Sequence, residues 1–244
     1  MVEPDFILNE KNSKPGIDGC RAGWCVVFEA NEQLHCKVTE NLSTLQLHNI
    51  DRCLIDMPIG LSSNRHIDQD LRERLKPHRH HSVFSVPARE AVYAADYATA
   101  KANNIKAFNK SVSIQSWNIC PKIKALDLLL IEQPNYKDRF MEAHPELCFM
   151  MLNKLTHLNH KKSTKEGQVE RLDILKRFDH RSEAVFKSAL SDYKRSELKA
   201  DDILDALVLF ISNQQELEFI ANNPLRDQYE IRMQIAYPNL KINY

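Results

Sequence analysis

Acidic residues stand where apolar segments of this sequence end or bend, and they are the first candidates for chemistry. A carboxylate inside an apolar segment is unfavourable unless a cation or hydrogen-bond donors meet it. Carboxylate oxygens suit Mg²⁺ and Mn²⁺, and two such ions can stabilise the attacking and leaving oxygens of a phosphodiester. We therefore expect a metal-dependent hydrolytic site if these side chains converge. The candidate metal ligands are Asp18, Asp56, Glu142, Asp202 and Asp205.

The stretch 15–28 surrounds Asp18 and contains three of the five glycines, at positions 16, 19 and 23. Such a cluster marks a bend or a close approach of backbone or ligand, because glycine is unfavourable inside a regular strand. Asp18 is thus predicted to face a metal or phosphate site. A hairpin in which Asp18 caps a turn accounts for the same residues equally well.

The late acidic group lies in the segment 199–213, which is nearly all apolar after its first turn. Residues three apart on a helix share a face, so Asp202 and Asp205 are predicted neighbours. The helix dipole is enough to explain Asp202 in the first turn. Asp205 is different, because it is flanked by Leu204 and Leu207 and needs a cation or a donor there.

Apolar runs and turn residues predict an α/β fold with a mixed sheet of about five strands, the first three antiparallel. Helices are expected on both faces of the sheet, with residues 62–110 as a helical insertion in a single domain spanning 1–244. Strands are predicted over 16–30, 34–40, 52–60 and 139–145, and helices over 115–132, 145–152, 166–178, 181–193 and 199–213. We also expect a loose lead-in over 1–14, a short helix over 43–48, and an irregular tail from 222 with one last strand.

The composition argues against several classes of protein. The 33 Lys and Arg residues balance 33 Asp and Glu residues, so no global field attracts nucleic acid. The segments 72–81 and 154–165 are locally basic, and each is either a phosphate contact or a solvated surface. The six cysteines include no C-x-x-C pair and indicate reduced core residues. Without a long apolar run or a signal-peptide pattern, we expect a cytoplasmic protein with no membrane partner.

Six motifs occur in order along most of the chain. They are G-I-D-G-C-R-A-G-W, I-D-M-P-I-G-L, S-V-F-S-V-P-A-R, S-I-Q-S-W-N-I, E-A-H-P-E-L-C-F and D-D-I-L-D-A-L. Together they resemble the family called domain of unknown function 429, over about residues 15–210. That family is predicted to be a ribonuclease-H-like nuclease family, so the resemblance implies a ribonuclease-H-like fold.

The ribonuclease H superfamily carries one aspartate on its first strand, a second acid at a later strand end, and further acids on a late helix. The resemblance therefore implies four catalytic residues, Asp18, Asp56, Glu142 and Asp205. The pattern D-x-x-D-A at 202–206 is similar to the final-helix motif of Holliday-junction resolvases.

Residues in or near the matching motifs are candidate substrate contacts. They are Arg89, Gln115, Lys122 and Lys162. Arg89 is expected either to face the acidic site or to form a structural ion pair. His144 could assist proton transfer or be satisfied in the core, and the histidines within 78–81 lack zinc-site spacing and indicate a solvated loop.

The leading hypothesis is a nuclease or phosphodiesterase that uses Mg²⁺ or Mn²⁺ on nucleic acid or a nucleotide-like substrate. A non-catalytic protein that binds a cation or a basic ligand at the same carboxylates is the alternative from another class. An actin-like phosphotransferase is a weaker alternative. That group needs further glycine-rich loops for phosphates, and the only glycine after Gly60 is Gly167.

Overall fold

The computed structural model of the protein describes residues 12–45, 49–63 and 65–240. The chain forms two compact units. The sheet unit comprises Met1–Asp56, Asp138–Glu218 and Ala236–Tyr244, and the helical unit comprises Met57–Lys137 and Phe219–Ile235. The insertion expected over 62–110 lies inside the helical unit, which also includes part of the tail.

Seven strands form one mixed sheet, which confirms the predicted α/β class. They are β1 (Gly16–Cys20), β2 (Gly23–Ala30), β3 (Gln33–Thr39), β4 (Cys53–Ile55), β5 (Phe140–Ala143), β6 (Glu216–Ile220) and β7 (Ile235–Asn239). The strand order is β3-β2-β1-β4-β5-β7-β6. Strand β2 is antiparallel to β1 and β3, as predicted, whereas β4 is parallel to β1 and β5.

The sheet has more strands than the five or so predicted, because β6 lies between α8 and the tail, where no strand was predicted, and β7 is the last strand expected in the tail. Strand β6 contains Glu216 and Glu218, and its residues are mostly exposed or half-buried. Acidic residues are depleted in strands, so this segment carries a weak strand signal. The predicted hairpin between β2 and β3 is present, and it turns at Asn31 and Glu32 with φ values of 52° and 61°. Positive φ at both positions is typical of the tight turn that matches strand twist.

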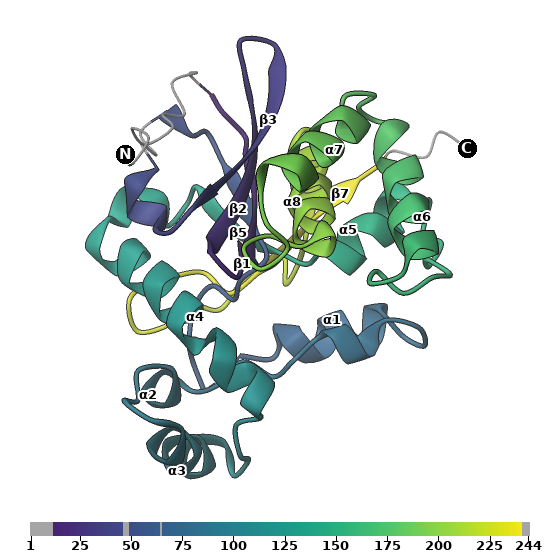
Figure 1. Ribbon diagram of the computed structural model, residues 1–244. Helices are drawn as coiled ribbons and strands as arrows, with labels where there is room; N and C mark the ends of the chain where they lie inside the picture. The colour runs from purple at the N-terminus through teal and green to yellow at the C-terminus, as the bar shows by residue number, and fades with distance from the viewer. Residues whose placement is uncertain (1–11, 46–48, 64, 241–244) are drawn as a thin grey trace. The chain divides into compact units, whose positions relative to one another are not determined.

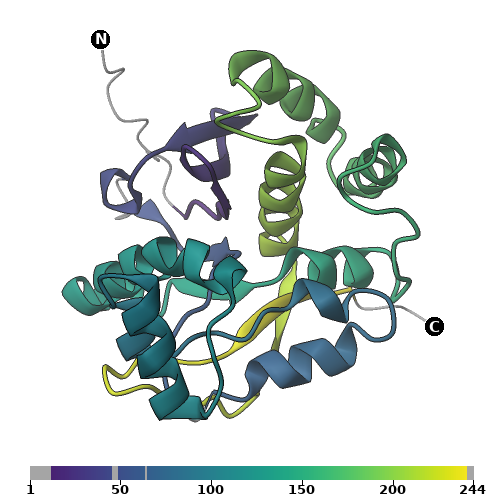
Figure 2. The same ribbon diagram turned by 60° about the horizontal axis from the view of Figure 1, so that its bottom comes forward.

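Helix α8 (Ala200–Asn213) forms the centre of the sheet unit and packs against β1, β2 and β4. All its residues from Ile203 onward are buried. Gly16 permits the close approach, because a Cβ atom there would overlap the backbone of Phe210 and Ala206. In both ribbon views α8 lies between the first strands and α6 (Lys165–Lys176) (Figures 1 and 2).

The remaining helices follow the predicted segments closely. The sheet unit adds α5 (Pro145–Leu152) and α7 (Ser182–Asp192). The helical unit contains α1 (Ile67–Arg74), α2 (Arg89–Val92), α3 (Tyr97–Phe108) and α4 (Ile114–Glu132). No helix among the described residues is long and apolar enough to cross a membrane.

Two expectations fall partly on residues outside the described ranges. The lead-in predicted over 1–14 is described only from Asn12 onward. Of the helix predicted over 43–48, residues 46–48 are not described, and the preceding segment forms a short 3-10 turn, η1 (Leu42–Thr44).

Candidate active site

Asp18, in the middle of β1, and Asp56, directly after β4, lie side by side on two neighbouring parallel strands. Ile17 of β1 pairs with Ile55 of β4, and the Asp56 amide donates to the Ile17 carbonyl at 2.9 Å. The next residue along each strand is therefore an aspartate, and alternation places both side chains on the face that carries Gly16. Asp18 is buried and accepts a hydrogen bond from the Gly19 amide at 2.7 Å. The edge formed by strand carboxyl ends is where open α/β sheets bind ligands.

Helix α8 brings Asp205 to the same face, because it packs directly on Gly16. Asp205 is only 2% exposed. Asp202, one turn earlier, accepts a hydrogen bond from the Lys199 amide at 2.9 Å and so helps to cap the helix. It remains half-exposed at the edge of the group. We call Asp18, Asp56, Asp202 and Asp205 the carboxylate cluster.

Lys162 supplies the cation of the carboxylate cluster. It lies in the loop between α5 and α6, and its Nζ donates to Asp205 Oδ2 at 2.6 Å. The Asp205 side chain is 3% exposed and the Lys162 side chain 43% exposed, so the lysine stem reaches in from the surface. The negative charge of Asp205 is the largest influence on the pKa of Lys162 and raises it.

The carboxylates raise one another's pKa values. Burial, followed by the charges of Asp56 and Asp205, raises the pKa of Asp18 well above its ordinary value. Burial and then Asp205 raise the pKa of Asp56 to about 8. Burial also raises the pKa of Asp205, although Lys162 opposes that shift, and it raises the pKa of Asp202 to about 6. If all four were ionised, the Lys162 ammonium would balance only one of their charges, so protonation or a further cation must reduce the repulsion.

Glu142 does not share the face of the other predicted ligands. It pairs with Ile55 across β4 and β5, and Ile55 pairs with Ile17. Because register partners point to the same side of a sheet, Glu142 lies on the face opposite Asp18 and Asp56. It is buried, and its charge still raises the pKa of Asp56, behind the effects of burial and Asp205. The strands thus separate Glu142 from the carboxylate cluster.

Glu146 and Arg171 adjoin the cluster and were not predicted from the sequence. Arg171 is fully buried and its Nη2 donates to Glu146 Oε1 at 2.5 Å. The charge of Glu146 raises the pKa values of Asp56 and Asp205, and Arg171 lowers that of Asp205. Glu146 occurs in the motif E-A-H-P-E-L-C-F, but an acid in a first helical turn is explained by the helix dipole. No local pattern indicated that Arg171 would be buried.

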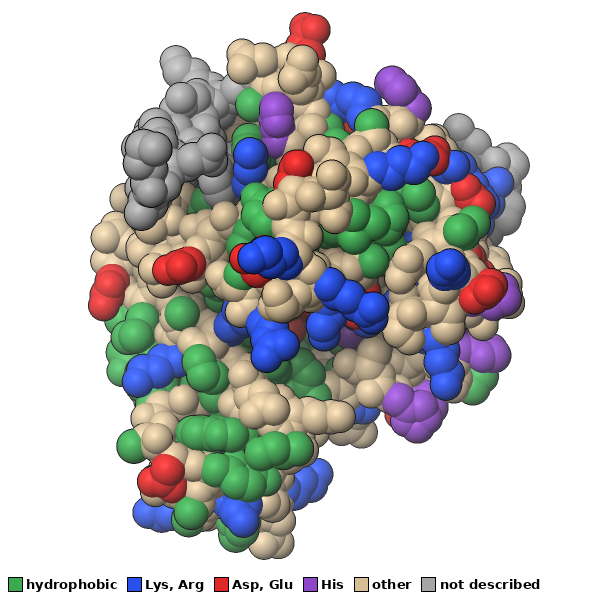
Figure 3. Space-filling view, in the orientation of Figure 1, with side chains coloured by type: hydrophobic (Ala, Val, Ile, Leu, Met, Phe, Trp, Pro, Cys, Tyr) green, Lys and Arg blue, Asp and Glu red, His purple; other side chains and the backbone are tan. Residues whose placement is uncertain are grey.

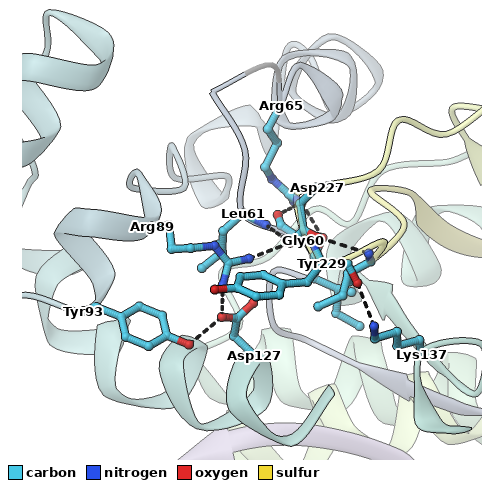
Figure 4. A network of polar contacts seen from close by, with 11 residues as sticks. Gly60, Leu61, Arg65, Arg89, Tyr93, Asp127, Lys137, Asp227 and Tyr229 are labelled. Atoms are coloured by element: carbon cyan, nitrogen blue, oxygen red, sulfur yellow. Dashed lines mark hydrogen bonds and ion pairs between the residues drawn. The ribbon is translucent and has the colours of Figure 1, made fainter. Parts of the chain in front are cut away.

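Arg89 belongs to a polar network within the helical unit (Figure 4). Its guanidinium forms ion pairs with Asp127 and with Asp227, the latter at 2.6 Å. The Tyr93 hydroxyl donates to Asp127 at 2.6 Å, and the ring of Tyr229 lies against the Arg89 guanidinium at 4.6 Å. Of the two roles expected for Arg89, these contacts correspond to the structural ion pair.

The other predicted contacts lie in different elements. Gln115 is exposed in the first turn of α4, and Lys122 is half-buried further along the same helix. His144 is the residue that precedes α5, and the rings of His80 and His81 lie 3.7 Å apart in the loop after α1.

The donor chemistry of the cluster suits a divalent cation, since every candidate ligand atom is a carboxylate oxygen. Among the described residues, however, no three His, Cys, Asp or Glu side chains stand in an arrangement ready to hold a metal ion. The ion pair of Lys162 with Asp205 gives a physical reason, because the ammonium already engages one carboxylate.

Comparison with known proteins gives one match. A family model described as "Protein of unknown function (DUF429)" matches residues 16–217, which include every residue of the carboxylate cluster and Lys162. No curated protein and no solved structure matches the chain.

Proposed function

Because the chain belongs to the DUF429 family, whose description states no activity, we propose a function from the side chains themselves: a nuclease or phosphodiesterase that requires Mg²⁺ or Mn²⁺. One observation carries the proposal. Asp18 and Asp56 on two neighbouring parallel strands and Asp205 on α8 are gathered on one face of the sheet, with Lys162 as the lysine that balances them. Such an excess of charge favours binding of a divalent cation.

Each residue has a distinct role in this proposal. Asp18, Asp56 and Asp205 hold the metal ion, and Asp202 contributes more weakly from the edge of the cluster. When bound, the metal supplies Lewis acidity and a water of lowered pKa. Lys162 moves from Asp205 to the phosphate of the substrate. Glu142 acts only through its charge on Asp56, from the other face of the sheet.

The proposed substrate class is nucleic acid or a nucleotide-like phosphodiester. Lys162 belongs to the basic segment 154–165, and a second basic segment lies at 72–81. Lys and Arg are spread among acidic and apolar side chains on the face in Figure 3, as expected for a chain without net charge. Recognition would therefore depend on a few local cations, and apparent affinity should fall as salt rises.

The carboxylate–lysine contact favours a second candidate, a non-catalytic protein that binds a cation or a basic ligand. Lys162 already neutralises Asp205, as a basic ligand would. The two candidates share the site and differ only in whether a bond is broken.

Metal binding is tested by thermal unfolding with and without Mg²⁺ or Mn²⁺. A ligand that binds only the folded state raises its melting temperature. The double variant Asp18→Asn with Asp56→Asn is expected to lose that rise completely, while the exposed control Asp51→Asn keeps it. A rise that persists undiminished in the double variant excludes these two residues as principal ligands.

Cleavage is tested on single- and double-stranded DNA, RNA, hybrids, branched junctions and cyclic dinucleotides, each with Mg²⁺ or Mn²⁺. Asp56→Asn is expected to lower kcat by at least about 100-fold, since removing a central ligand removes most of the metal's contribution. Activity unchanged in Asp56→Asn would come from a contaminant. If no substrate is cleaved although the metal binds, the non-catalytic candidate is supported.

A further inference from the structure

The loop that carries Lys162 is held by α6 at several points. Glu170 accepts hydrogen bonds from the backbone amides of Asn159 and His160 at 2.8 and 2.9 Å. Arg171, the next residue of α6, donates to the His160 carbonyl at 3.3 Å. Two adjacent helical residues therefore fix the backbone just before Lys162.

The backbone next to Lys162 is pressed against the first turn of α6. A Cβ atom on Gly167 would overlap the carbonyl group of Lys161, so only glycine allows this approach. Both the amide and the hydroxyl of Thr164 donate to that carbonyl at 3.0 Å. The Thr164 hydroxyl also accepts from the Gly167 amide at 3.1 Å and so caps the helix.

These contacts are anchored in the core through Arg171. Its side chain is 0% exposed and joins Glu146 of α5, the Gly167 carbonyl and the loop. The loop is thus tied on both sides of position 162. The backbone of the loop is therefore fixed, and the Lys162 side chain extends from it to the carboxylate cluster.

We propose that Glu170 and Arg171 are positioning residues, which hold the loop 159–164 so that the Lys162 ammonium is a fixed cation of the carboxylate cluster. This inference rests on the proposed function, in which Lys162 gives up Asp205 when a metal ion binds and then contacts the phosphate. A preset loop keeps the ammonium close to both partners. Small displacements of such a group lower rates strongly, by about 100-fold for 1 Å in favourable cases.

The inference predicts a specific pattern of Mn²⁺ affinity. Lys162→Met is expected to bind Mn²⁺ about tenfold more tightly, because an ammonium at the cluster competes with and repels the ion. Glu170→Ala frees the loop but keeps the ammonium, and should tighten binding by about threefold. In the Lys162→Met background, Glu170→Ala should have no further effect, since its influence acts through the lysine.

A second measurement reports on Lys162 directly. An amine-labelling reagent, followed by mass spectrometry of the peptide, should modify Lys162 several-fold faster in Glu170→Ala than in the wild type. The matched control is Glu183→Ala, which removes the same charge from a half-exposed glutamate paired with Lys176 and Lys187. This control should change neither the Mn²⁺ affinity nor the labelling rate.

The two proposals fail in different ways. An equal effect of Glu170→Ala on Mn²⁺ affinity in both backgrounds, or an unchanged labelling rate, would overturn the positioning role whatever the cleavage assays give. If the expected pattern is found but no phosphodiester is cleaved, the positioning of Lys162 stands and the proposed hydrolysis falls.

Discussion

At the scale of single residues, the carboxylate cluster is a site of stored electrostatic repulsion. Asp18, Asp56 and Asp205 are held together in a poorly solvated place with one ammonium among them. Ionising several carboxylates close together is unfavourable in free energy, so protonation, a bound cation or both must reduce the repulsion between them. Perturbed carboxylates of this kind are concentrated at functional sites.

The raised pKa of Asp56 gives a prediction for stability against pH. Its pKa is about 8 in the folded protein against an ordinary value of 3.8, so the folded state binds a proton more tightly than the unfolded state. The free energy of unfolding should therefore fall as pH rises from about 4 to about 8 in metal-free buffer. Asp56→Asn removes the group that titrates, and should flatten this fall and stabilise the protein at pH 8. We expect a gain of about 2 kcal/mol, less than the roughly 1.4 kcal/mol per pKa unit of the full shift, because the Asp56 side chain is only half-buried.

Thermal unfolding at pH 5, 6.5 and 8 in the presence of a chelator measures this effect. A gain of 2 kcal/mol corresponds to roughly 5 °C in melting temperature for a protein of this size. Asp51→Asn, an exposed substitution of the same type, should leave the slope unchanged. An Asp56→Asn variant that loses stability equally at all three values of pH would contradict the electrostatic account.

The sequence predicted all four members of the cluster, and for three of them it did so for a sound physical reason. Asp18, Asp56 and Asp205 each stand in or directly after an apolar segment, and burial of those segments takes the carboxylates with them. Glu142 satisfies the same criterion, yet its side chain lies on the other face. A shift of one residue in strand register reverses the face, and composition does not determine register. Only the pairing of Ile55 with Glu142 shows it.

At the scale of elements, the site depends on how closely α8 approaches β1. The approach brings Asp205 to Asp18 and is possible because Gly16 has no side chain. The sequence showed the glycine cluster and left open whether backbone or ligand comes close to it. In the structure, the group that comes close to Gly16 is the backbone of α8. Long-range packing of this kind cannot be derived from local patterns.

Gly16→Ala should test this dependence. The new methyl group would overlap the backbone of Phe210 and Ala206, which cannot move aside as a flexible side chain does. Overpacking in a core typically destabilises by about 1–3 kcal/mol, and contact with the α8 backbone instead of a flexible side chain should place this variant at the upper end. Chemical denaturation measures the loss. A variant of wild-type stability would mean that α8 is not seated on β1 in this way.

The displacement of α8 should also weaken metal binding, because Asp205 moves with it. Gly16→Ala is therefore expected to show a smaller Mn²⁺-induced rise in melting temperature than the wild type. An unchanged rise would show that Asp205 is not needed for the ion.

At the scale of the whole molecule, the chain consists of two compact units, and each is built from segments that are separated in the sequence. The expected insertion over 62–110 covers about half of the helical unit, which also includes residues 111–137 and 219–235. Asp227 joins residues 219–235 to the rest of the helical unit, because it accepts from Arg89 at 2.6 Å and from the Leu61 amide at 3.1 Å. It also accepts from the Ile231 amide of its own segment at 3.1 Å. A pairing over more than a hundred residues leaves no trace in local sequence patterns.

Arg89→Met tests whether the helical unit has stability of its own. The variant leaves Asp227, which is 0% exposed, and Asp127, which is 3% exposed, without their cation. Removing one partner of a buried ion pair costs about 3–5 kcal/mol, because the remaining charge is uncompensated. Lys76→Met, which breaks an exposed ion pair with Glu73 in the same unit, should cost less than about 1 kcal/mol.

Native-state hydrogen exchange should show faster exchange in α2, α4 and residues 225–233 of Arg89→Met, while β1 and α8 keep their protection. Uniformly faster exchange in both units would instead show that they unfold as one cooperative structure.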